Sequence, residues 1–183
     1  MTVSSELRAA LDVQNCMVYD HRGRIEAVRD TNAHSVTYRE CPEVGTCVAY
    51  ALGLFQDKTY QAISGWYFQG EIFAGKSFVE WLLDKKLLGE PCRRSPGCLV
   101  LYFADDVWQH IGIVAVENRV ISKWGTFPVY EHELLEVPES YGSDVRSFTR
   151  PTPDQALKLF IEYAKACHGI NDRDIKDAIE FER

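Results

Sequence analysis

Three short apolar segments separated by polar turns stand out in the middle of the chain. Residues 98–104 (CLVLYFA) form a continuous apolar run, which predicts a buried strand. Residues 110–116 (HIGIVAV) and 119–125 (RVISKWG) predict two more strands, and the polar pairs at 105–106 and 117–118 suit tight turns between them. Strands joined by such short turns pair antiparallel, so the pattern predicts a three-stranded meander.

Apolar residues at helical spacing appear on both sides of this meander. The predicted helices cover residues 4–13, 46–55, 77–89, 130–137 and 152–169. The helix at 77–89 has clear end signals, because Ser77 is a suitable N-cap, Glu80 completes a capping box and Gly89 is a stop signal. Helices combined with an antiparallel meander indicate the α+β class.

The remaining segments are shorter or less regular. Residues 15–28 predict two short strands around a turn, and residues 144–150 predict a last strand. Residues 30–45 are polar and predict a loop. Residues 57–75 hold several aromatics and glycines without clear periodicity, which predicts a loop that crosses the core or forms a surface lid.

The length of the chain, 183 residues, is that of one domain. We therefore expect a single domain over residues 1–183, with its core at about 40–150 and the terminal elements as additions. Hydrophobic residues make up 46% of the chain, which excludes a mainly disordered protein.

The charge of the chain limits its partners. The formal net charge is −7 and the pI is near 5.2, and the one basic pair, Arg93-Arg94, is expected to be a solvated turn. This argues against nucleic-acid binding, which needs a stripe of Lys and Arg. No apolar run approaches the roughly 20 residues of a membrane span, and residues 1–8 lack a signal-peptide core. We expect no membrane partner and a cytoplasmic location, with export by another route and the oligomeric state left open.

The cysteines are expected to be free thiols, as in most cytosolic proteins. They are Cys16, Cys41, Cys47, Cys92, Cys98 and Cys167. The CxxC spacing of zinc knuckles is absent, so no metal is expected. No organic cofactor is implied either.

Cys47 has the sequence context of a nucleophile. It lies in the first turn of a predicted helix, directly after Gly45-Thr46, where helix amides favour a thiolate. Its own amide is also a candidate oxyanion donor. The alternatives are that Cys47 is a small buried hydrophobe, or that Cys41, in the preceding loop, is the reactive thiol.

His110 begins a predicted strand, where its imidazole can act as a base toward a helix terminus packed on the sheet. A surface histidine at a strand end is the alternative. Pairing across the turn at 117–118 places Ser122 or Trp124 near the level of His110, with Lys123 on the other side. Ser122 is therefore the candidate third residue that orients the imidazole.

Other residues are candidates for substrate contact. Trp108, Lys123 and Trp124 flank the predicted pair in sequence and are candidates for shaping a substrate pocket, with core or rim packing as the alternative. His132 is either a second site residue or a histidine on a helix face. The aromatic residues of 60–73 are candidates for a cleft wall or for core packing.

The order of these features resembles the NlpC-type cysteine peptidases, a circularly permuted branch of the papain-like superfamily. Residues 46–50 (TCVAY) correspond to the nucleophile motif of that family and residues 110–113 (HIGI) to its histidine strand. Ser122, twelve positions after His110, falls on the third polar position. Residues 46–53 and 122–125 also resemble an uncharacterised bacterial group that has a Cys-Ile-Ala-Tyr-Ala-like helix and a Ser-Lys-Leu-Gly-like strand. The resemblance covers about residues 40–150 and implies a nucleophile helix packed on an antiparallel meander.

The resemblance implies a cysteine hydrolase that cleaves an amide bond of a peptide or protein, with Cys47 as nucleophile, His110 as base and Ser122 as third residue. Three positions depart from the family pattern, since Thr46 precedes the cysteine, Val48-Ala49 follow it, and a serine stands third. These departures keep open a papain-fold binding or regulatory protein without catalysis. A deamidase or transglutaminase-type effector, which would use the same Cys–His chemistry, is the other alternative.

Overall fold

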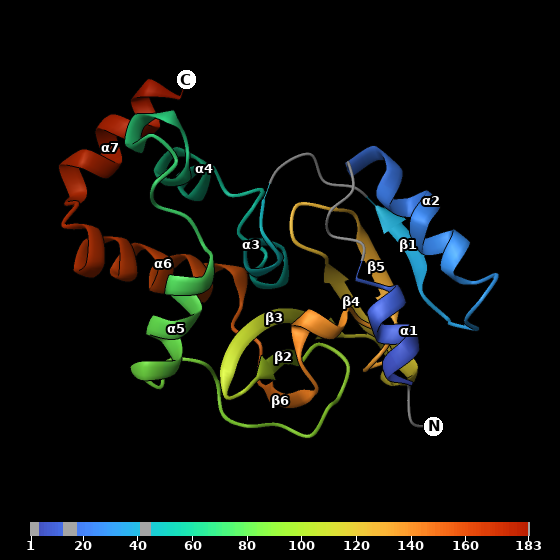
Figure 1. Ribbon diagram of the computed structural model, residues 1–183. Helices are drawn as coiled ribbons and strands as arrows, with labels where there is room; N and C mark the ends of the chain where they lie inside the picture. The colour runs from blue at the N-terminus through green and yellow to red at the C-terminus, as the bar shows by residue number, and fades with distance from the viewer. Residues whose placement is uncertain (1–3, 13–17, 41–44, 183) are drawn as a thin grey trace.

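The computed structural model describes residues 4–12, 18–40 and 45–182, which form an α+β protein built on one antiparallel sheet (Figure 1). The strand order is β1-β5-β4-β3-β2-β6. The strands are β1 (Thr37–Glu40), β2 (Leu99–Ala104), β3 (Val107–Val114), β4 (Val120–Lys123), β5 (Val129–His132) and β6 (Asp144–Phe148). The predicted meander is confirmed as β2, β3 and β4, and the predicted last strand as β6.

The register of the strands gives the sheet two buried faces. Leu99 and Leu101 of β2 belong to one apolar core, whereas Val100 and Tyr102 of the same strand belong to a second core. This alternation follows from the two-residue period of a strand. Because both faces are buried, β2 reads in the sequence as a continuous apolar run.

Two groups of helices cover these faces (Figure 1). The first core packs against α3 (Cys47–Leu52), α4 (Lys58–Ser64), α5 (Lys76–Asp84), α6 (Pro153–His168) and α7 (Asp172–Phe181). The second core packs against α1 (Ser5–Ala10) and α2 (Val18–Val28). Short 3₁₀ turns η1 (Trp66–Phe68), η2 (Val116–Asn118) and η3 (Glu139–Tyr141) connect the larger elements.

The predicted helices at the two ends and at Cys47 are confirmed as α1, α6 and α3. In α6, Thr152 and Gln155 form a capping box and Gly169 ends the helix in a left-handed conformation. The capping box predicted for Ser77 and Glu80 is wrong. Helix α5 begins at Lys76, because the chain enters it from the extended backbone of Gly75 without a side-chain cap. It ends at Asp84, several residues before Gly89.

Two segments have the opposite secondary structure to the one predicted. The hairpin predicted over residues 15–28 is wrong, because residues 18–28 form helix α2; residues 15–17 lie outside the described residues. Ion pairs between side chains four residues apart, Arg24–Asp20 and Arg22–Glu26, stabilise this largely exposed helix. The helix predicted over 130–137 is also wrong, because its first residues form β5, whose four side chains are all buried.

Two further helices lie where none was predicted. The 57–75 segment contains α4, whose N-cap Asp57 accepts hydrogen bonds from the amides of Thr59 and Tyr60, followed by η1. Helix α7 begins with a capping box between Asn171 and Asp174. In both cases the short side chain at the N-cap is the sequence signal, and the apolar pattern behind it is too short to show a period.

The expectation of free thiols is wrong for one pair, because Cys92 and Cys98 form a disulfide. The chain turns back between them, with the Cys98 amide bonded to the Ser95 carbonyl at 3.0 Å. Cys47 and Cys167 are free, and Cys16 and Cys41 lie outside the described residues. None of the described helices combines the length and the apolar character that crossing a membrane requires.

Gly142 connects η3 to β6 at a position where no other residue fits. Its φ of 82° and ψ of 175° lie in a region that is open essentially to glycine alone, and a Cβ atom there would overlap the carbonyl oxygen of Phe103 in β2.

We expect Gly142→Ala to lower the free energy of unfolding by about 2 to 4 kcal/mol, as measured by urea denaturation. Gly169→Ala is the matched control, with a positive φ but no neighbour within 4 Å, and should cost about 1 kcal/mol. Equal losses in the two variants would contradict the account of the Phe103 contact.

Candidate active site

Cys47 is the first residue of α3, as predicted. The hydroxyl of the N-cap Thr46 accepts a hydrogen bond from the Ala49 amide at 3.1 Å and donates one to the carbonyl of Ala74. Gly45 precedes this cap with a φ of 111°, a left-handed value that favours glycine. Cys47 as a whole residue is half-buried and packs against the first core. The sequence Gly45-Thr46 therefore sets both where the helix starts and where the thiol lies.

The first turn of α3 lies where β3 and β4 stop pairing. Their ladder consists of Ile113↔Ile121 and Val114↔Val120, while β4 continues to pair with β5 up to Lys123. Helix α3 packs against both β3 and β4. Among the groups that lower the pKa of the Cys47 thiol, the backbone amide of Ile111, the residue after His110, has the largest effect. The thiol is thus held at the point where the two strands separate.

The groups around the Cys47 thiol shift its pKa in opposite directions. Burial raises the pKa of Cys47 to about 11, while the backbone amides of Ile111, Val48 and Cys47 and the charge of Lys123 act to lower it. Burial outweighs the amides and the ammonium group. In this structure Cys47 is therefore a neutral thiol at neutral pH, surrounded by groups that would stabilise a thiolate once it forms.

His110 is buried in β3 and lies against an aromatic side chain. Its ring stacks on Tyr141 with 3.9 Å between the ring centroids and 15° between the planes, and its Nε2 has no hydrogen-bond partner among the described residues. Burial, and secondarily the charge of His132, lowers the pKa of His110 well below its usual value. The imidazole is therefore neutral. No hydrogen bond joins Cys47 to His110 in the described residues, although Cys47 contacts the amide of the next residue along β3.

Ser122 is fully buried and is bonded to residues other than His110. Its Oγ lies 2.9 Å from Nε2 of His132 and accepts a hydrogen bond from Nε1 of Trp124 at 3.1 Å. His132 Nδ1 lies 2.8 Å from the Glu133 carbonyl, which only accepts, so Nδ1 carries the ring proton. The Ser122 hydroxyl accordingly donates to His132. The contact predicted between Ser122 and His110 is not among the hydrogen bonds of the described residues.

His132 is therefore a member of the buried polar cluster rather than a histidine on a helix face, which corrects the prediction for this residue. It is fully buried on β5, opposite Val120 of β4. Burial lowers the pKa of His132 to about 4, so the ring is neutral and accepts the Ser122 proton. The strand signal was hidden because residues 129–132 are too short a run to distinguish period 2 from period 3.6.

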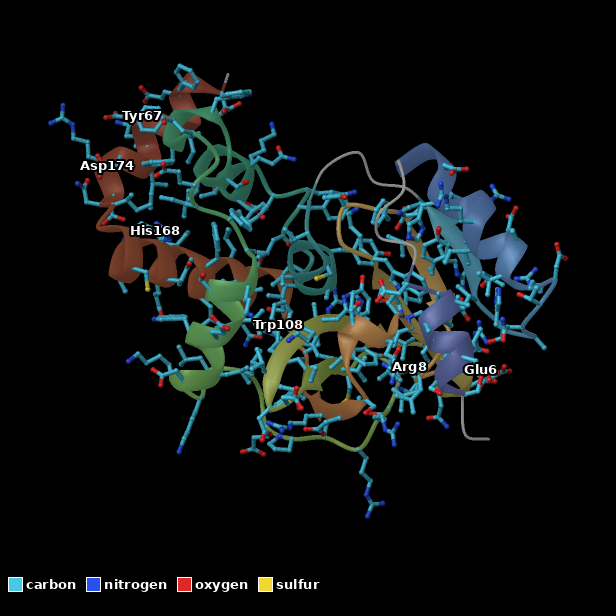
Figure 2. All side chains as sticks on the ribbon, in the orientation of Figure 1. Glu6, Arg8, Tyr67, Trp108, His168 and Asp174 are labelled. Atoms are coloured by element: carbon cyan, nitrogen blue, oxygen red, sulfur yellow. A yellow bond between two sulfur atoms is a disulfide. The ribbon has the colours of Figure 1, made fainter. Side chains whose placement is uncertain are left out.

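Sequence reasoning missed the role of Arg8 and Tyr141. The Arg8 guanidinium on α1 (labelled in Figure 2) donates hydrogen bonds to the carbonyls of Val137, Pro138 and Gly142, which fixes the segment that contains η3. Burial raises the pKa of Tyr141, and electrostatic interactions with Cys47 and Asp12 act in the same direction. Tyr141 thus stacks on His110 and is electrostatically coupled to Cys47. No periodic pattern in the sequence connects position 8 with position 141.

The three candidates for substrate contact are all nearly completely buried: Trp108, Lys123 and Trp124. Lys123 donates a hydrogen bond from Nζ to the Phe127 carbonyl at 2.7 Å. It follows Ser122 directly in β4, so the two side chains alternate between the faces of the sheet. Trp108 (Figure 2) belongs to the first core, and its Nε1 has no partner among the described residues. These three side chains expose almost no surface that a substrate could contact. Their contact with a substrate stays a prediction.

An open pocket of about 750 Å³ lies beside the start of α3. Gly45 and Thr46, which precede Cys47, form part of its wall, together with residues of α4 and of the turn after β4. Across the described ranges, no three His, Cys, Asp or Glu side chains are grouped so that they could hold a metal ion.

Comparison of the chain with protein-family models, with curated proteins and with solved structures gave no match.

The neutral buried histidines generate a pH dependence of stability. Burial lowers the pKa of His21 and of His132 to about 4, below the value of about 6.5 in the unfolded chain. The unfolded state therefore binds more protons between these values, and stability is lost as the pH falls from 6.5 to 4. We expect each of the two histidines to lower the free energy of unfolding by about 2 kcal/mol between pH 7 and pH 5, as measured by urea denaturation.

Two variants test this assignment. His132→Gln should reduce the difference between pH 7 and pH 5, whereas a change at the exposed His168, His168→Gln, should leave it as in the wild type. A wild-type protein equally stable at both pH values would contradict the burial of neutral histidines.

Proposed function

We propose that the protein is a cysteine hydrolase that cleaves an amide bond, with Cys47 as nucleophile and His110 as base. The observation that carries the proposal is the position of the Cys47 thiol, at the first turn of α3 and against the backbone amide that follows His110. A nucleophile at a helix N-terminus beside a strand that bears a histidine is the arrangement that thiol hydrolysis needs. The order of helix, meander and histidine strand agrees with a papain-like fold of the NlpC type, which forms part of the proposal.

The chemistry runs in two halves. In the first, the Cys47 sulfur attacks the carbonyl carbon of the amide while His110 takes the thiol proton. The carbon–nitrogen bond then breaks, His110 returns the proton to the leaving amine, and a thioester remains on Cys47. In the second half, water attacks the thioester with His110 as base, which releases a carboxylic acid and restores the thiol. The Cys47 amide is positioned to donate to the oxyanion in both halves.

The pKa shifts of Cys47 and His110 indicate at which stage of the proposed reaction the thiol proton is transferred. Burial raises the pKa of Cys47 to about 11 and lowers that of His110, so the resting pair is a thiol and a neutral imidazole. Proton transfer creates two opposite charges side by side, which stabilise each other in a buried site. The amides of Val48 and Ile111 and the charge of Lys123 support the thiolate at that moment. The proposal is therefore general-base activation during attack rather than a permanent ion pair.

Tyr141 acts in this proposal as a positioning residue. Its ring covers one face of the His110 imidazole, and Arg8 fixes the segment that presents it. Stacked aromatic rings contribute about 0.5–1.5 kcal/mol. This contact holds the imidazole plane without using a ring nitrogen as hydrogen-bond donor or acceptor.

The first test is labelling with a thiol-reactive acyl probe at neutral pH, read by peptide mass spectrometry. We expect acylation at Cys47, loss of that label in Cys47→Ala, and a labelling rate at least about 100-fold lower in His110→Ala, because general-base catalysis contributes about 10²- to 10⁴-fold. Cys167→Ala is the matched control, since Cys167 is an exposed free cysteine, and it should leave labelling of Cys47 unchanged. An equal rate at Cys47 in His110→Ala would contradict the proposal.

A binding or regulatory protein of the same fold is the second candidate, and two observations favour it. The Cys47 pKa is raised rather than lowered, and Nε2 of His110 lacks the hydrogen-bond partner that would orient a catalytic imidazole. This candidate predicts no acylation of Cys47 above the rate of Cys167 and no turnover of any amide. The same labelling experiment therefore separates the two functions.

A further inference from the structure

The pocket beside the start of α3 is lined by residues from Gly45 and Thr46, before the candidate nucleophile, to Glu182 after α7. Its wall at one end is Gly45 and Thr46, directly before Cys47, and at the other end is Glu182, just past α7. Contacts between α4 and α7 and between α7 and η1 hold this end together. A ligand in the pocket would therefore extend from the residues directly before Cys47 toward the C-terminal helix.

Aromatic side chains form much of the surface in and around this pocket. Phe55, Tyr60 and Phe73 line it, and the Phe73 ring, 46% exposed, lies directly over Gly75. Beside them Trp66 is 82% exposed and Phe181 is 64% exposed. Single exposed aromatic residues are common, but several gathered at one pocket mark a ligand surface.

The charge of the pocket is negative. Among its described lining residues Glu182 is the one carboxylate, and none is Lys or Arg. An oxygen of Glu182 accepts the Trp66 amide at 3.2 Å, and the carboxylate lies so close to Gly65 that a Cβ atom there would overlap it. The carboxylate is thus held against the backbone at Gly65 and Trp66, whose exposed side chain starts from the same point of the chain. The net charge of −7 adds a negative field around it.

We propose that this pocket binds a basic side chain, arginine or lysine, of a peptide substrate. The aliphatic stem lies along the aromatic wall, and the cationic head lies between the Trp66 ring and the Glu182 carboxylate. Aromatic faces attract cations, tryptophan most strongly, and a nearby carboxylate adds to that attraction. The proposal rests on the proposed hydrolase function for what happens next, since a peptide bound in this way presents a neighbouring amide to Cys47.

Binding is measured in Cys47→Ala, so that no turnover is needed. The probes are acetyl-Ala-Ala-Arg-amide and the same peptide with citrulline, which keeps the shape of arginine without its charge, and the readout is titration calorimetry supported by tryptophan fluorescence. We expect the arginine peptide to bind about tenfold more tightly than the citrulline peptide.

Matched variants on the Cys47→Ala background assign the preference to the pocket. Glu182→Gln should bring the two peptides to within about twofold, because it removes the charge that distinguishes them. Trp66→Ala should weaken the arginine peptide more than the citrulline peptide. Glu180→Gln, an exposed change on the same helix outside the pocket lining, and Tyr38→Ala, an exposed aromatic on β1, should leave both affinities unchanged.

The outcomes separate this inference from the proposed hydrolase function. Equal binding of the two peptides, or a preference that survives Glu182→Gln, overturns the assignment of the pocket even if the acyl probe labels Cys47. An arginine preference that depends on Glu182, in a protein whose Cys47 is not acylated, confirms the pocket and leaves the hydrolase proposal as the one that fails.

Discussion

The separation of β3 from β4 beyond Ile113 and Ile121 is the feature on which the candidate site depends. A fully paired ladder would direct the Ile111 amide and its neighbours into strand hydrogen bonds. Helix α3 packs against β3 and β4, and the Ile111 amide at this point of β3 lowers the pKa of the Cys47 thiol. The residues that begin α3, Gly45 and Thr46, set the position of the thiol within this gap. The proposed nucleophile, its supporting amides and the adjoining pocket all lie at this junction.

The groups around the junction are neutral because they are buried, and this shapes the proposed mechanism. His110, Ser122 and His132 lie on the sheet face that α1 and α2 cover, and the hydrogen bonds of Ser122 are directed to His132 and Trp124. Nε2 of His110 is the polar atom of this cluster that remains without a partner. An unpaired buried nitrogen is costly, so a pure packing role does not account for Nε2 of His110.

Residues near both ends of the chain contribute to the candidate site. Arg8 on α1 binds three carbonyls of the segment around Tyr141, and Tyr141 stacks on His110. Glu182, near the other end, closes the outer part of the pocket. The terminal elements, expected to be additions to a central core, therefore hold and extend the candidate site. Their contacts cross more than 100 residues of sequence and could not be seen in any local pattern.

The features that sequence analysis predicted correctly are those with a strong local signal. The apolar runs of β2 and β3, the start of α3 at Cys47 and the capped helix α6 needed no knowledge of distant contacts. The prediction failed where tertiary pairing decides, as in β5, a four-residue strand that exists because β4 and β1 flank it. It failed also for α2, which buries little and is stabilised by ion pairs on its surface. The register predicted across the turn at 117–118 placed Ser122 near the level of His110. In the structure Ser122 lies beside Gly112, and its hydroxyl is directed to His132, which was predicted to be helical.

The pH dependence of Cys47 acylation in the wild type and in His110→Ala tests the central claim most directly. With a neutral His110 acting as base, the wild-type rate should be nearly constant from about pH 7 to pH 9, because a histidine of lowered pKa is already unprotonated there. In His110→Ala the rate should instead rise about tenfold per pH unit over the same range, following the thiolate of a group whose pKa is about 11. Parallel profiles in the two proteins would show that His110 does not take the Cys47 proton and would contradict the account.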